Sequence, residues 1–143
     1  MPKYRRKVTK ILVYDLEATC WKNQDKNKTD SEIIEIGMVP VDLINMSVRT
    51  DLAYSSLIKP EKSKVSEYCT ELTGITQRQI DDNGITLKQA VLEIKEKYSG
   101  NHATAGYGDW DEHFLKNAIE RIGLKFLKQL VLMLSHYHQF VSV

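Results

Sequence analysis

The sequence predicts a mixed α/β domain in which helices cover a partly antiparallel sheet. β-prone stretches joined by short connections come first, and helix-patterned segments then alternate with a further strand. This order is typical of one mixed sheet with helices packed on it. A chain of 143 residues can bury one modest core, so we expect residues 1–143 to form a single domain.

Three strands are expected in the first part of the chain. Residues Ile11–Tyr14 are apolar or aromatic and mostly β-prone, which is typical of a buried strand. A second strand is expected at 32–41 and, after a turn at 42–47, a third at 49–58, which ends before Pro60. Because their connections are short, these strands should pair as an antiparallel meander.

The pattern then changes to short helices. We expect one at 66–72 with Gly74 as its terminator, because glycine readily adopts the left-handed conformation at helix ends. Thr76 can cap a second short helix at 77–81, since a threonine hydroxyl accepts a hydrogen bond from a free N–H group of the first turn.

A longer helix, a small-residue strand and a final helix are expected next. Thr86 caps the longer helix, whose apolar positions follow helical spacing at Leu87, Ala90, Val91, Ile94 and Tyr98. The strand covers 102–107, and the final helix opens at Asp109 and ends at Gly123. Its expected buried stripe consists of Phe114, Leu115, Ala118, Ile119 and Ile122.

Composition excludes several classes of protein. The apolar share of 42% and the mixed charges indicate a globular chain and not a disordered one. The net charge of +1 gives no overall field for nucleic acid, although basic residues crowd the N-terminus as a solvated arm or a phosphate contact. No apolar run has transmembrane length and no signal sequence is recognisable, so we expect a cytoplasmic protein. Cys20 and Cys69 are expected to be free thiols.

Two carboxylates follow the first strand, at Asp15 and Glu17. Side chains at positions i and i+2 of a strand lie on the same face, so these two should project side by side. Neighbouring carboxylates repel each other unless a cation lies between them, and oxygen ligands suit Mg²⁺ or Mn²⁺. An Asp-x-Glu triplet also arises by chance in many chains, so the pair alone does not define a site.

A third carboxylate follows a glycine-flanked turn at 106–108. A strand leads into this turn and a helix leaves it, which places Asp111 in the first helical turn, where the helix dipole stabilises an anion. An acidic first turn can be purely structural. Beside Asp15 and Glu17, however, Asp111 could supply the third oxygen ligand of two ions about 4 Å apart, an arrangement that promotes in-line phosphoryl displacement.

Motifs spread along the chain resemble those of the DEDDh 3′→5′ exonucleases, the RNase T-like enzymes. The resemblance is strongest to the Eri-type RNA exonucleases and the bacterial KapD-like proteins, and it covers residues 10–123. It rests on Asp-Leu-Glu-Ala-Thr-Cys-Trp (15–21), Glu-Ile-Ile-Glu-Ile-Gly (32–37), Glu-Leu-Thr-Gly-Ile-Thr (71–76) and Gly-Asp-Trp-Asp-x-x-Phe-Leu (108–115). It implies a ribonuclease-H-like fold, a mixed sheet flanked by helices.

The resemblance assigns roles to individual residues. Asp15, Glu17 and Asp111 would hold two Mg²⁺ or Mn²⁺ ions, and Asp111 is preferred over Asp109 because the family's metal ligand directly follows the aromatic residue. The residues implied to contact substrate are Ala18 and Thr19 at the 3′-terminal sugar, Trp21, and a wedge formed by Leu72, Thr73, Gly74 and Ile75. Packing explains Trp21 equally well, and a helix end with a turn explains the wedge residues.

The family's third motif, a histidine followed four or five residues later by an aspartate, has no counterpart in this chain. In the family the histidine deprotonates the attacking water and the aspartate completes the metal site, but here no Asp or Glu follows Glu120. His136 and His138 have no partnered acid and are weak alternatives for the base, as is His113. Residues 124–143 diverge from the family, and we expect a shortened family member.

Two functions are compatible with these features. The first is a metal-dependent 3′→5′ exonuclease acting on single-stranded RNA or DNA ends, with RNA slightly favoured and with feeble or absent turnover because the third motif is missing. The second is a catalytically dead remnant that binds nucleic acid or a protein partner, for which the KapD-like resemblance suggests regulation of sporulation.

Overall fold

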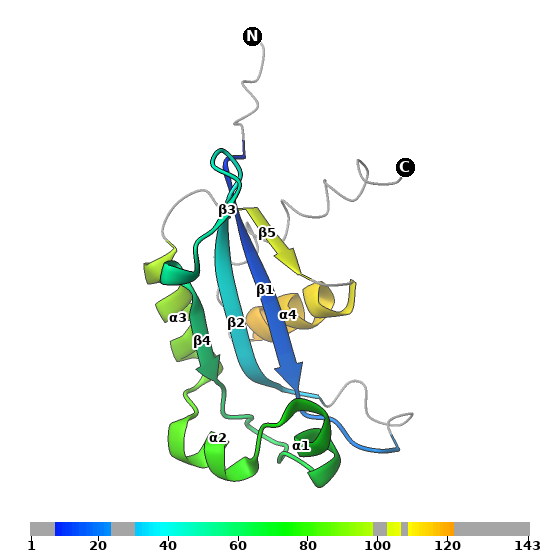
Figure 1. Ribbon diagram of the computed structural model, residues 1–143. Helices are drawn as coiled ribbons and strands as arrows, with labels where there is room; N and C mark the ends of the chain where they lie inside the picture. The colour runs from blue at the N-terminus through cyan, green and yellow to red at the C-terminus, as the bar shows by residue number, and fades with distance from the viewer. Residues whose placement is uncertain (1–7, 24–30, 99–102, 107–108, 122–143) are drawn as a thin grey trace.

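The computed structural model describes residues 8–23, 31–98, 103–106 and 109–121. These form the predicted mixed α/β fold, a five-stranded sheet with helices packed on it (Figure 1). The strands are β1 (Lys10–Ala18), β2 (Ile33–Asp42), β3 (Ser47–Val48), β4 (Tyr54–Leu57) and β5 (Ala103–Gly106). The helices are the 3₁₀ turn η2 (Thr50–Leu52), α1 (Glu67–Thr73), α2 (Gln77–Asn83), α3 (Leu87–Lys97) and α4 (Asp109–Arg121).

β1 lies inside the sheet, between β2 and β5 (Figure 1). It pairs antiparallel with β2 and parallel with β5, and β2 also pairs antiparallel with β3 and β4. This pairing confirms the predicted antiparallel meander and the later parallel strand. The continuous third strand predicted at 49–58 is wrong, because Thr50–Leu52 form a 3₁₀ turn that separates β3 from β4.

Hydroxyl side chains and one glycine fix the helix ends, and those at Thr76, Thr86 and Gly74 confirm the predictions. Ser66, Thr76 and Thr86 each accept a hydrogen bond from the backbone N–H three residues later, at the starts of α1, α2 and α3. Gly74 ends α1 with φ 75°, a left-handed conformation that costs glycine little. The end of the final helix predicted at Gly123 lies outside the described residues. None of the described helices is long and apolar enough to cross a membrane.

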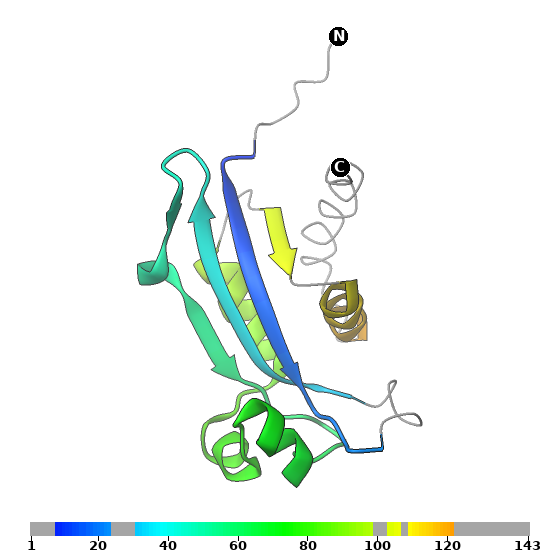
Figure 2. The same cartoon turned by 45° about the vertical axis from the view of Figure 1, so that its right-hand side comes forward.

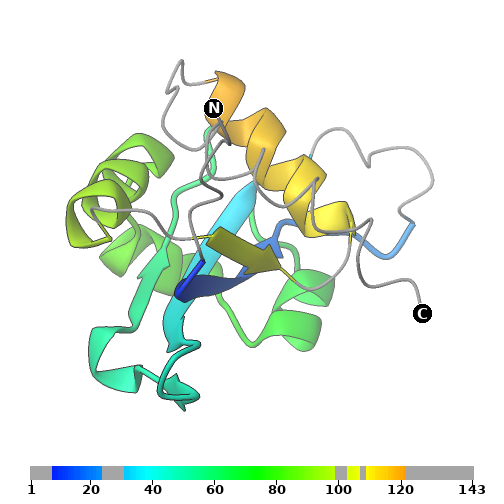
Figure 3. The same cartoon turned by 90° about the horizontal axis from the view of Figure 1, so that it is seen from above.

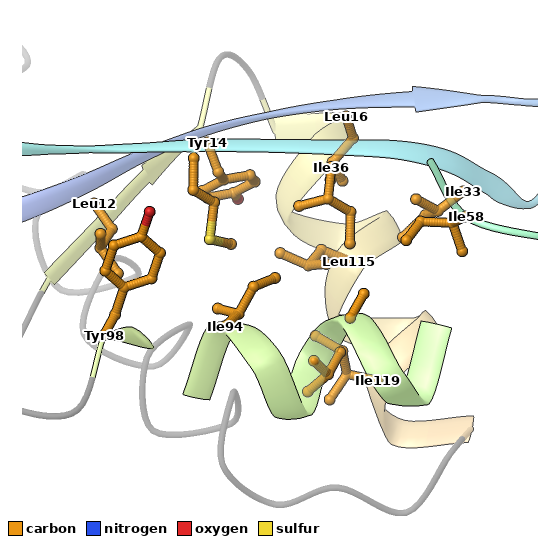
Figure 4. Packing of buried hydrophobic residues seen from close by; sticks show 13 residues of the cluster. Leu12, Tyr14, Leu16, Ile33, Ile36, Ile58, Ile94, Tyr98, Leu115 and Ile119 are labelled. Atoms are coloured by element: carbon orange, nitrogen blue, oxygen red, sulfur yellow. The ribbon is translucent and has the colours of Figure 1, made fainter. Parts of the chain in front are cut away.

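β1 is buried on one face only, which corrects the expectation of a buried strand. Leu12, Tyr14 and Leu16 are at most 6% exposed, whereas Val13 between them is 40% exposed. Figure 4 shows the buried face packed against helical side chains. These come from α3 and α4 and include Val91, Ile94, Leu115 and Ile119.

The helices divide into two groups around the sheet. α3 and α4 cover the same face, α3 on the side of β4 and α4 beside β5 (Figures 2 and 3). α1 and α2 lie at the end of the sheet where β1 ends (Figures 1 and 2). The carboxyl end of β1 is therefore bordered by α1 on one side and the start of α4 on another.

A β-bulge in β2 allows adjacent residues to serve two hydrophobic clusters. Glu17 pairs with Glu35 but Ala18 pairs with Ile33, so Ile34 is one extra residue on β2. Ile33 joins the main core on the α3–α4 face. Ile34 is fully buried in a second cluster at the α1–α2 end, which contains Cys69, Ile75 and Ile80. The bulge thus anchors α1 and α2 next to the carboxyl end of β1.

Replacing Gly106 with alanine should destabilise the fold. A Cβ at this position would lie 2.5 Å from Cζ of Tyr14, and that ring is only 2% exposed and cannot move freely. We expect Gly106→Ala to lower the unfolding free energy by about 1–3 kcal/mol, the usual cost of overpacking, as measured by urea denaturation.

Gly37→Ala is the matched control, because a Cβ there would meet no atom within 4 Å. It should change stability far less. Equal losses in the two variants would mean that the contact with Tyr14 is not what requires glycine at 106.

Candidate active site

The structure places Asp15 and Glu17 side by side on the face of β1 opposite the main core. They alternate with Tyr14 and Leu16, whose side chains are buried, so both carboxylates share the other face. Asp15 is exposed and Glu17 is half-buried. β1 therefore presents two oxygen-donor groups to the surface from a backbone that is paired with β2 along this stretch.

Glu35 adds a third carboxylate that the sequence reasoning did not assign. It lies directly opposite Glu17 in the β1–β2 pair, and like charges in that position destabilise a sheet. Gly37 lies opposite Asp15 and leaves open space beside it. The sequence motif 32–37 contains Glu35. Its position opposite Glu17, however, depends on the β-bulge in β2, and no local sequence pattern predicts that bulge.

The first turn of α4 begins beside this pair of strands. Tyr14 pairs with Gly106, so β5 ends level with the residue before Asp15, and α4 starts at Asp109 shortly afterwards. Asp111 therefore lies in the first turn of α4 at the edge where β1 carries its carboxylates. The side chains of Asp111 and His113 lie outside what the structure describes, as do residues His136 and His138.

Some of the residues expected to contact substrate are accessible. Leu72 is 63% exposed on α1, Gly74 is exposed at its end, and Ala18 and Trp21 are half-buried. α1 packs at the end of β1, so Leu72 belongs to the element that borders the carboxylate face on this side (Figures 1 and 2).

Others are engaged inside the fold. Thr19 is 0% exposed, and its hydroxyl accepts a hydrogen bond from the Glu32 N–H at 2.9 Å and shares another with Ser63 at 3.1 Å. The Thr73 hydroxyl donates to the Cys69 carbonyl at 2.8 Å, and Ile75 is 6% exposed in the second cluster. In this structure these side chains hold the chain around the carboxylates, and their contact with substrate stays a prediction.

The Glu32 carboxylate holds the 61–63 segment near the end of β1. It accepts hydrogen bonds from the N–H groups of Glu61, Lys62 and Ser63, at 2.6, 2.9 and 2.7 Å, and from the Ser63 hydroxyl at 2.6 Å. Partial burial alone would raise the pKa of Glu32, but these donors outweigh it and lower the pKa below its ordinary value of 4.5.

The donors present suit a divalent cation of the hard, oxygen-preferring type. Asp15 and Glu17 supply carboxylate oxygens on one face, and Asp111 starts from a neighbouring edge. Among the described side chains, no group of three His, Cys, Asp or Glu residues is close enough to hold an ion. Asp15 and Glu17 therefore fit part of a metal site, and a further ligand, for which the sequence suggests Asp111 of α4, is needed to complete it.

This fold is shared by a family of nucleases. The profile of the RNase_T family, described as exonuclease, matches residues 12–142. The chain therefore belongs to this exonuclease family, and the resemblance based on the motifs is confirmed. The match continues beyond residue 123, the last residue that the motif resemblance covers.

Several curated proteins are similar to the chain. ERI1 exoribonuclease 2 of Xenopus laevis is 36% identical over 88 residues, which are 61% of this chain and 12% of the relative. The 3′-5′ exonuclease Snipper of Drosophila melanogaster is 34% identical over 60% of this chain and 30% of its own. The 3′-5′ exoribonuclease 1 of Rattus norvegicus is 32% identical over 93% of this chain and 41% of its own. The chain thus spans less than half the length of these relatives.

Solved structures share the fold. The nuclease domain of 3′hExo, a DEDDh family member bound to rAMP, superposes with a TM-score of 0.68 and 28% identity, covering 84% of this chain and 62% of that chain. Cell-death related nuclease 4 (CRN-4) superposes with a TM-score of 0.73 over 83% of this chain and 42% of that chain, at 19% identity. The second likeness concerns the fold alone.

Neutralising Glu32 should weaken the fold at neutral pH. In Glu32→Gln the charge that accepts the backbone N–H groups is lost, and we expect a loss of roughly 1–3 kcal/mol in unfolding free energy. A lowered folded-state pKa contributes stability that is present above the unfolded value near 4.5 and is lost as pH falls through the folded value. Urea denaturation from pH 7 to pH 3 should therefore show the wild type and the variant converging at the acid end. A gap that stays constant over this range would contradict the assignment.

Mn²⁺ should stabilise the folded chain through Asp15 and Glu17. An ion present at about 100 times its Kd raises the unfolding free energy by about 2.7 kcal/mol. In Asp15→Asn this gain should disappear, whereas stability without metal should stay equal or rise, because a repulsive carboxylate has been removed. Thermal unfolding with and without Mn²⁺ measures both quantities.

The control is Asp51→Asn, which changes an exposed aspartate of η2 in the same way. Its response to Mn²⁺ should match that of the wild type. A response that survives in Asp15→Asn would place the ion elsewhere on the protein.

Proposed function

We propose that the chain is a metal-dependent 3′→5′ exonuclease module that hydrolyses phosphodiester bonds at single-stranded 3′ ends, with RNA preferred over DNA. The observation that carries this proposal is the Asp15–Glu17 pair, held side by side on the exposed face of a central strand in a member of an exonuclease family. The preference for RNA is supported by relatives named exoribonucleases.

Asp15, Glu17 and Asp111 are proposed to hold two Mg²⁺ or Mn²⁺ ions. Ions bound there supply Lewis-acid stabilisation of the attacking and leaving oxygens. The contribution of β1 is a fixed backbone: it pairs with β2 along the stretch that carries the two carboxylates, so they keep their spacing as substrate enters. Glu35 lies opposite Glu17 and adds a third negative charge, so a bound cation would relieve more repulsion at this face.

The 3′ end is proposed to enter over the face of β1 that carries the carboxylates. The open space at Gly37 beside Asp15, where an added Cβ would meet no atom within 4 Å, supports this path. Leu72 offers an exposed apolar surface at the side of α1 for the terminal base, and stacking on Trp21 would add about 1–3 kcal/mol per base. Ala18 has no side chain long enough to block the terminal sugar.

Turnover by this chain is proposed to be slow. No Asp or Glu follows Glu120, so the residues after α4 offer no carboxylate as a fourth metal ligand. A missing positioned base typically costs about 10²–10⁴-fold in rate. The same feature supports a second candidate function, a catalytically inactive module that still binds single-stranded nucleic acid or a protein partner.

Degradation of a 5′-labelled single-stranded oligoribonucleotide tests the proposal. With Mn²⁺ the wild type should produce a ladder of products shortened from the 3′ end, and Asp15→Asn or Glu17→Gln should reduce the rate by about two orders of magnitude, since each removes a metal ligand worth several kcal/mol. The matching DNA oligonucleotide should be degraded more slowly.

Asp51→Asn serves as the control here too, and it should leave the rate unchanged. If the wild type binds the oligonucleotide without shortening it, the inactive binding module is supported. A ladder that persists in Asp15→Asn would come from a contaminating nuclease and would overturn the assignment.

A further inference from the structure

Two thiols meet beside the carboxylate edge and take no part in the proposed chemistry. Cys69 is fully buried in α1, and Cys20 packs against the same cluster as a half-buried side chain. Both thiols therefore belong to one cluster at the carboxyl end of β1. The Cys69 thiol also donates to the Ala18 carbonyl at 3.4 Å, so it touches the last residue of β1.

The surrounding contacts hold the backbones of the two cysteines in place. The Ser66 hydroxyl donates to the Cys20 carbonyl at 2.6 Å and, as the N-cap of α1, accepts from the Cys69 N–H at 3.0 Å. One serine thus ties Cys20, two residues beyond the end of β1, to the first turn of α1. These hydrogen bonds keep the backbones of Cys20 and Cys69 close to each other, and both side chains enter the same cluster.

We propose that Cys20 and Cys69 are a redox-active pair that closes to an intramolecular disulfide on reaction with a small-molecule disulfide such as oxidised glutathione. The bond would fasten the segment that follows Asp15 and Glu17 to α1. It closes a long loop that contains β2, β3 and β4, and long loops gain most from such a restraint on the unfolded chain.

The reaction proceeds by two exchanges. The Cys20 thiolate attacks a glutathione sulfur, which breaks the glutathione disulfide and releases one glutathione thiolate. The Cys69 thiolate then attacks the Cys20 sulfur of the mixed disulfide and expels the second glutathione. The two protons lost by the cysteines are taken up by the two glutathione thiolates, so two cysteines are oxidised and one glutathione disulfide is reduced.

The surroundings of the two thiols determine which of them attacks glutathione first, and they predict that the reaction is slow. Cys20 is the accessible member of the pair, whereas Cys69 is 0% exposed. Burial, the neighbouring Cys69 thiol and the nearby charge of Glu17 raise the pKa of Cys20 to about 11. The Cys20 thiol is therefore protonated at neutral pH, and the pair stays reduced until a disulfide is supplied in excess.

Intact-mass measurement of the full chain after incubation with oxidised glutathione tests this proposal. The product should lack two hydrogens, carry no glutathione and yield one cross-linked peptide pair containing Cys20 and Cys69. Alkylation after denaturation should fall from two thiols per chain to none, and the urea midpoint should rise. This readout does not require nuclease activity, so its failure is distinct from failure of the proposed function.

Serine variants separate the two positions. Cys69→Ser should accumulate a stable glutathione adduct on Cys20, and Cys20→Ser should leave Cys69 unmodified while the chain is folded. A stable glutathione adduct on the wild type, a disulfide between two chains, or two free thiols after prolonged incubation would each overturn the proposal.

Discussion

The period-two alternation of side chains along β1 is the constraint on which the rest of the structure depends. On one face Leu12, Tyr14 and Leu16 are buried against α3 and α4. On the other face the same strand carries Asp15 and Glu17 to the surface. Because both sets lie on one strand that is paired with β2 along its length, burial of the apolar set fixes the spacing of the carboxylates. The positions of Asp15 and Glu17 are therefore fixed by the packing of the core on the other face of β1.

The elements around β1 are held to its carboxyl end by separate devices. The bulge at Ile34 gives α1 and α2 a cluster of their own. Glu32 fixes the 61–63 segment through backbone N–H groups, and Ser66 joins Cys20, just beyond β1, to α1. Each of these contacts involves only a few residues, and together they hold segments that are distant in the sequence against the carboxyl end of β1.

Much of this architecture could be predicted from the sequence, because its signals are local. The helix caps at Ser66, Thr76 and Thr86 and the left-handed Gly74 follow from side-chain chemistry at single positions. The i, i+2 spacing also predicted the shared face of Asp15 and Glu17. What failed depends on partners far away: which face of β1 is covered, and where the 3₁₀ turn divides the third strand. The placement of Glu35 opposite Glu17 likewise requires the register, which one extra residue in β2 shifts.

The close approach of Tyr14 to Gly106 links the interior to the surface. The aromatic ring fills the position that a side chain at 106 would occupy, and the backbone that follows leads directly into α4 and Asp111. The ring thus acts as a spacer that sets how near α4 can begin to β1. A substitution at either position that alters this packing would therefore also shift the start of α4 relative to β1.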